Sequence, residues 1–156
     1  MPLFRRRGDR PPEPSLQFTV GTRDHRVAVG GAERGLTMLE ELRGYVASVI
    51  GPAALPGPDG RDSVAVLSAK MDHAEMVTDT VSAVVLALEE LAERGVVPEG
   101  AVPSPPRLAS ALAGEGHYAY IQETHRRAEA RMDWLEQADA VLREHGVAIL
   151  PPVVSG

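Results

Sequence analysis

An amphipathic repeat between residues 63 and 94 constrains the fold more than any other feature of this sequence. Apolar or small residues recur there at alternating steps of three and four, which predicts one helix with a continuous stripe along it. At 1.5 Å per residue this helix is about 45 Å long, so it needs a long partner to cover the stripe. The stripe consists of Val64, Leu67, Met71, Ala74, Thr78, Val81, Val85, Leu88 and Ala92.

A second long stripe lies near the C-terminus and predicts a helix over about 117–145, closed by Gly146 as a C-terminal cap. Two long helices with matched stripes favour a long antiparallel helical hairpin, and we expect this hairpin to form most of the core. The second stripe consists of Ile121, His125, Ala128, Met132, Leu135 and Leu142.

A shorter helix is predicted over about 38–50. Thr37, followed three residues later by Glu40, has the form of a capping box, and Gly51-Pro52 ends the helix. Before it, alternating apolar residues between positions 16 and 29 predict a small N-terminal β-hairpin, with residues 21–25 as its turn. The fold class is therefore mainly α.

The two ends of the chain have a different character from its middle. Residues 1–15 form an extended, basic, Pro-rich arm, and we expect residues 16–146 to form a single helical domain. Residues 147–156 read as a C-terminal tail, strand-like at first and ended by Pro151-Pro152. Both ends carry too few large apolar groups to be buried on their own domain, which predicts a partner surface for them. The candidate contacts of the arm are Phe4, Arg5, Arg6, Arg7 and Arg10.

Composition narrows the possible functions. The chain has no cysteine, which excludes disulfides, thiolate metal sites and cysteine nucleophiles. Its net charge of −6 argues against general nucleic-acid binding by the body, although residues 5–10 offer a local basic site. Fifteen arginines against one lysine indicate a GC-rich genome such as that of an actinobacterium. With no long apolar run, we expect no membrane contact and a cytoplasmic protein, or a virion protein if it derives from a phage.

The segment KMDHAEMVTD contains the densest group of chemically active side chains. At about 100° per residue, Asp72, Glu75 and Asp79 share one side of the helix, whereas His73 points elsewhere, in line with apolar residues. We therefore expect a packed, hydrogen-bonded histidine and a solvated acidic side. His125 and Glu129 are spaced by four residues and share a face, but they match no known metal motif. We expect neither a metal nor any other cofactor.

One pattern suggests an enzyme. EELAE at 89–93 and EQAD at 136–139 have the E-E-x-x-E and E-x-x-D forms. Together they resemble the magnesium-binding pattern of the all-α nucleoside triphosphate pyrophosphohydrolases. The resemblance implies that helix carboxylates hold Mg²⁺ against the phosphates of a nucleotide. The residues that would do so are Glu89, Glu90, Glu93, Glu136 and Asp139.

The interpretation we favour is a non-enzymatic structural or interaction subunit of a larger multi-chain assembly, with a phage or phage-like particle as one setting. Long amphipathic helices, extended ends and the lack of a complete catalytic motif support it. A second apolar strip on the last helix, which includes Trp134 and Val141, is covered either by the chain itself or by another subunit. The alternatives are the pyrophosphohydrolase and a nucleic-acid-associated protein that docks through its Arg-rich arm.

Overall fold

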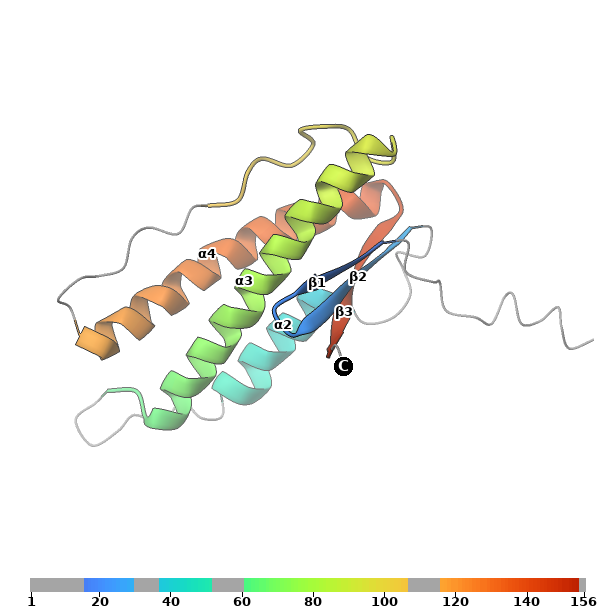
Figure 1. The fold of residues 1–156 in the computed structure, drawn as a ribbon. Coiled ribbons are helices and arrows are strands. Elements are labelled where there is room, and N and C mark those ends of the chain that lie inside the picture. Colours follow the sequence, from blue (N-terminus) through green and yellow to red (C-terminus); the bar gives the residue numbers. More distant parts are fainter. Residues whose placement is uncertain (1–15, 30–36, 52–60, 107–115, 155–156) are drawn as a thin grey trace, which may run out of the picture.

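The computed structural model describes residues 16–29, 37–51, 61–106 and 116–154, and it is mainly helical (Figure 1). Two long helices pack together beside a shorter one, and a small antiparallel sheet covers part of the helical layer, as Figure 1 shows. No described helix is both long enough and apolar enough to cross a membrane. In chain order the elements are β1 (Leu16–Val20), β2 (Arg23–Val29), α2 (Met38–Tyr45), the π-helical turn η1 (Val46–Ile50), α3 (Val64–Glu93), α4 (Gly116–Glu144) and β3 (Val147–Val154).

The long helices have the predicted extents, but they run parallel, so the expected antiparallel direction is wrong. Lys70 Nζ donates to Gln122 Oε1 at 2.8 Å, and further along Arg131 Nη1 donates to Thr78 Oγ1 at 3.3 Å. Residue numbers thus rise in the same direction on both helices. The described residues after α3, up to residue 106, run back beside the helices (Figure 1). A connection over residues 94–115 can span about 70 Å when extended, which exceeds the length of α3.

The buried side of α3 is rotated from the predicted stripe. Val64, at the start of that stripe, is 82% exposed, whereas Val77 and Leu91 are fully buried. The most buried line passes through Val66, His73, Val77, Val84 and Leu91. This rotation arises because α4, the sheet and α2 all pack on α3, so its buried arc is wider than one partner requires.

Local capping explains where the helices begin. Ser63 Oγ accepts a hydrogen bond from the Val66 N–H at the start of α3. Thr37 and Glu40 form the predicted capping box of α2, which continues through η1 to Ile50 and confirms the predicted helix over 38–50. The α2 segment packs against α3, α4 and β3.

The predicted β-hairpin is present, with a tighter turn than expected. Only Gly21 and Thr22 separate the paired residues Val20 and Arg23, and Gly21 has a φ of 64°, which suits glycine. The second strand therefore starts earlier than predicted. His25, expected in the turn, lies instead in β2 and is 2% exposed.

The C-terminal segment is a third strand rather than a tail. β3 pairs antiparallel with β2, and Val147, Ala148 and Ile149 are almost fully buried, so the expectation that residues 147–156 cannot be buried on their own domain is wrong for this part. Pro151-Pro152 was expected to end the strand. The register shifts beside these prolines, and such a bulge accommodates residues that lack an N–H. Arg26 Nη2 donates to Pro151 O at 2.6 Å.

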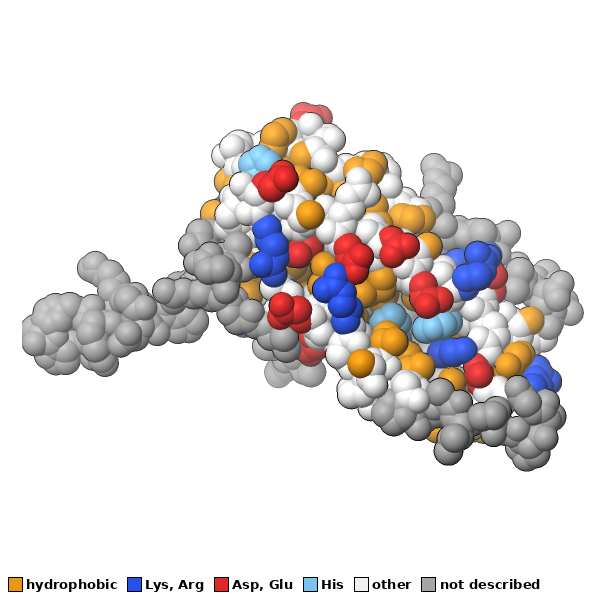
Figure 2. All heavy atoms as spheres, turned by 180° about the vertical axis from the view of Figure 1, so that it is seen from behind, with side chains coloured by type: hydrophobic (Ala, Val, Ile, Leu, Met, Phe, Trp, Pro, Cys, Tyr) orange, Lys and Arg blue, Asp and Glu red, His pale blue; other side chains and the backbone are white. Residues whose placement is uncertain are grey.

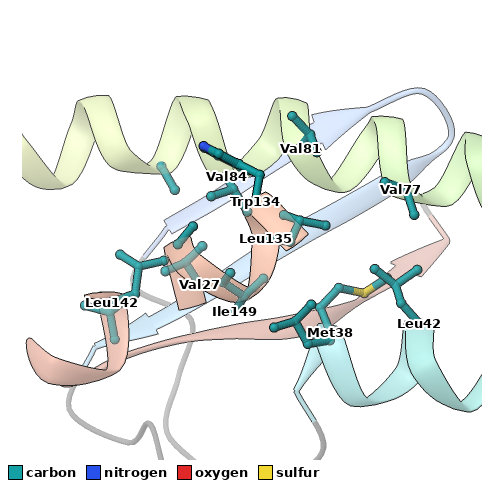
Figure 3. Close-up of a cluster of buried hydrophobic side chains, with 14 of the residues drawn as sticks. Val27, Met38, Leu42, Val77, Val81, Val84, Trp134, Leu135, Leu142 and Ile149 are labelled. Carbon is teal, nitrogen blue, oxygen red and sulfur yellow. The ribbon is translucent and has the colours of Figure 1, made fainter. Parts of the chain in front are cut away.

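One hydrophobic core joins the sheet to all three helices (Figure 3). Val27 and Ile149 of the sheet lie in the same cluster as Met38 of α2, Val84 of α3 and Leu135 of α4. The strands and α2 thus pack on the parallel pair α3 and α4 through a shared apolar layer.

Candidate functional site

A pair of histidines occupies the contact between α3 and α4. The ring centroids of His73 and His125 are 6.0 Å apart, and Tyr45 of α2 stacks on His73 at 6.1 Å with an interplanar angle of 20°. His73 is 1% exposed. Figure 2 shows one face of the molecule, on which acidic, basic and histidine side chains are interspersed.

Burial disfavours the charged form of both histidines. Burial lowers the pKa of His73, and nearby His125 lowers it further, while Glu129 acts in the opposite direction. Burial also lowers the pKa of His125, against the opposing effect of Glu129. Both nitrogens of His73 and Nδ1 of His125 are buried without a hydrogen-bond partner among the described residues. The expectation of a packed His73 is therefore confirmed, but the hydrogen bond expected with it is missing.

Next to the pair, the chain's single lysine closes a small polar network. Lys70 Nζ lies 2.6 Å from Asp62 Oδ2, and Gln122 bridges the two side chains by donating to Asp62 and accepting from Lys70. Its hydrogen bonds from Lys70 and Gln122 lower the pKa of Asp62. The network thus joins the N-terminal part of α3 to the N-terminal part of α4.

The structure separates His73 from the acidic residues of its segment, as predicted. Asp72 and Glu75 are exposed, whereas Asp79 is half-buried and lies against the hairpin turn, where a Cβ on Gly21 would come within 3.3 Å of Asp79 Oδ2. Within the described ranges, no three histidine, aspartate or glutamate side chains lie where they could share a metal ion. His125 and Glu129 share a side of α4 as expected, but they lack a third ligand there.

The five carboxylates of the pyrophosphohydrolase pattern are not gathered at one place. Glu136 pairs with Arg43 of α2, and Asp139 pairs with Arg143 on its own helix at 2.9 Å. At the end of α3, Glu90 pairs with Arg94 at 2.9 Å, while Glu89 and Glu93 are exposed. Since these side chains form no metal-holding group, the arrangement that would favour this enzyme is not seen.

Trp134 belongs to the core of its own chain. Its side chain is 5% exposed, and its indole N–H donates to Pro103 O at 2.7 Å. Pro103, in the segment after α3, therefore lies against Trp134, while Val141 is partly buried. The burial of Trp134 supports covering of this strip within the chain, and a role of Trp134 and Val141 in partner binding stays a prediction. The arm residues Phe4, Arg5, Arg6, Arg7 and Arg10 lie outside the described residues.

The two border strands of the sheet differ in sequence. β1 and β3 are the border strands, in the order β1-β2-β3. β3 contains Pro151 and Pro152, which have no N–H to give to a further strand. A helix packs against each border strand, α2 against β3 and α3 against β1. β1, with the sequence LQFTV, has neither a proline nor a charged residue. This difference between β1 and β3 was not predicted from the sequence, because residues 147–156 were expected to form a tail.

Comparison with known proteins gives no relative: no family model, no curated protein and no solved structure matches this chain.

Proposed function

We propose that this chain is a non-enzymatic interaction subunit of a multi-chain assembly, and that it docks through the open side of its sheet. The observation that carries the proposal is the border strand β1, which has no further strand beside it among the described residues. Border strands with free N–H and C=O groups are ready sites for pairing with another chain, and soluble proteins usually guard them with charge, proline, bulges or a covering helix. A helix packs against each border strand, α3 against β1 and α2 against β3, but only β3 also contains prolines, and β1 has no charged residue.

The proposal also includes the basic arm, because the arm immediately precedes β1 in the sequence. Residues 1–15 lead directly into Leu16, the first residue of β1. Arg5, Arg6, Arg7 and Arg10 suit an acidic partner surface. A phage-like particle of an actinobacterial host is one setting for such a subunit, a suggestion that rests on composition.

The test is a deletion of residues 1–12, compared with the full chain and with a full-length variant in which the four arginines of the arm become glutamine. We expect both changes to leave the melting temperature nearly unchanged and to reduce the size of the assembly, measured by light scattering. The glutamine variant shows whether charge or length matters.

Three outcomes would contradict the proposal. Unfolding of the truncated chain would place the arm in the core, and an unchanged assembly would make the arm a bystander. Binding of nucleic acid by the full chain, lost in both variants, would favour the nucleic-acid-associated alternative.

A further inference from the structure

The open strand β1 has the same polarity pattern in both directions. In LQFTV, apolar residues alternate with uncharged polar ones, and Phe18 stands at the centre. Leu16 is buried and Phe18 packs partly against the core, whereas Gln17 and Thr19 are exposed on the other face. A strand with this pattern can pair with an antiparallel copy of itself and match apolar with apolar and polar with polar.

The hairpin determines which backbone groups of β1 remain available. A two-residue turn closes on a hydrogen-bonded pair, here Val20 and Arg23, and bonded pairs then alternate along antiparallel strands. Leu16, Phe18 and Val20 therefore direct their backbone groups toward β2. The N–H and C=O groups of Gln17 and Thr19 point the opposite way, toward the open side.

We infer that two copies of this chain pair antiparallel along β1, with the two-fold axis at Phe18, to give one continuous six-stranded sheet. The inference rests on the proposed function and names its partner as a second copy. In this register Gln17 of each copy faces Thr19 of the other, and these pairs exchange about four main-chain hydrogen bonds. Phe18 faces its own copy, which forms an aromatic pair on the inner face.

The surroundings of β1 favour a second copy. The strand carries no charge, so pairing with itself brings no like charges opposite one another. On α3, which packs against β1, Leu86 is 42% exposed and gives that helix an apolar surface residue. Because each chain has a net charge of −6, added salt should strengthen the pairing.

A single introduced cysteine tests this register, since the chain has no cysteine of its own. In the inferred dimer, the Phe18→Cys residues of the two copies lie about 4.5 Å apart between Cα atoms, which suits a disulfide. The matched control, Gln17→Cys, places its two cysteines about 9 Å apart, beyond disulfide reach. We expect oxidation to link Phe18→Cys into a covalent dimer and to leave Gln17→Cys mostly unlinked. Linking of Gln17→Cys instead would overturn the inferred register.

A second pair of variants avoids the partly buried Phe18. Gln17→Pro removes an N–H that points toward the open side, whereas Gln17→Thr keeps that N–H and suits a strand. We expect Gln17→Pro to fold but to weaken the dimer at least tenfold, by sedimentation equilibrium, with Gln17→Thr close to the parent chain. If the parent assembles and Gln17→Pro assembles equally well, β1 is not the interface, although the proposed function stands. If the parent stays monomeric at all salt concentrations and also with candidate partners, the proposed function itself fails.

Discussion

Replacing His73 by leucine should make the protein more stable. A neutral imidazole has one donor and one acceptor nitrogen, and neither nitrogen of His73 has a partner among the described residues although the side chain is 1% exposed. Each buried polar group without a partner costs about 1–3 kcal/mol. Leucine removes both costs but also the ring stack on Tyr45, worth about 0.5–1.5 kcal/mol, and it fits the site imperfectly. We expect a net gain of about 1–3 kcal/mol, which raises the melting temperature by roughly 2–12 °C.

The same substitution should flatten the dependence of stability on pH. Burial and His125 hold the pKa of folded His73 below its ordinary value of 6.5, so the unfolded chain binds more protons once the pH falls below about 6.5. Stability is therefore lost on the acid side, by at most about 1.4 kcal/mol per pH unit for each such histidine. His25 and His125, whose pKa values burial also lowers, add to the loss.

The assay is urea denaturation of the parent and of His73→Leu at several pH values between 5 and 8. His117→Leu serves as the control because His117 is exposed near the start of α4. Destabilisation of His73→Leu at neutral pH, or an unchanged slope below pH 6.5, would refute the reasoning. Either result would indicate that the ring nitrogens have partners in solution.

Two further predictions concern the helix pair. Val81→Asp should destabilise the protein by more than about 3 kcal/mol, because Val81 is 5% exposed within the core and the new charge has no partner; a melting temperature near that of the parent would contradict this. Lys70→Met should lower the free energy of unfolding by about 1–3 kcal/mol, since the half-buried carboxylate of Asp62 loses its cation. The same change should raise the pKa of Asp62 toward its ordinary value. A double-mutant cycle with Asp62→Asn, followed by urea denaturation, should show a coupling of at least about 0.5 kcal/mol, and strict additivity would show that the pair is not formed.

The sequence predicted the elements of this fold well because their signals are local. The capping box at Thr37 and the alternation around Phe18 depend on residues only a few positions apart. The direction of helix packing depends on no such signal. The apolar stripe on α4 is equally compatible with a parallel and an antiparallel partner helix. The parallel arrangement is possible because the connection after α3 is long enough to span the length of that helix.

The third strand was misread for a related reason. Pro151-Pro152 is a strong local sign that a strand ends. In the structure the strand continues, because it pairs with β2, which is distant in sequence, and the prolines lie at a register shift of that pairing. The same long-range pairing makes β1 a border strand, so the candidate docking site was not visible in the sequence. The isolation of His73 from Asp72 and Glu75 was predictable, because helical angles alone decide it.

Sedimentation equilibrium of the intact chain over a wide range of protein and salt concentrations tests the central claim most directly. The account predicts a mass of at least twice the 16.6 kDa of one chain, with a dimer that becomes stronger as salt is added. A single species of 16.6 kDa under all of these conditions would contradict it.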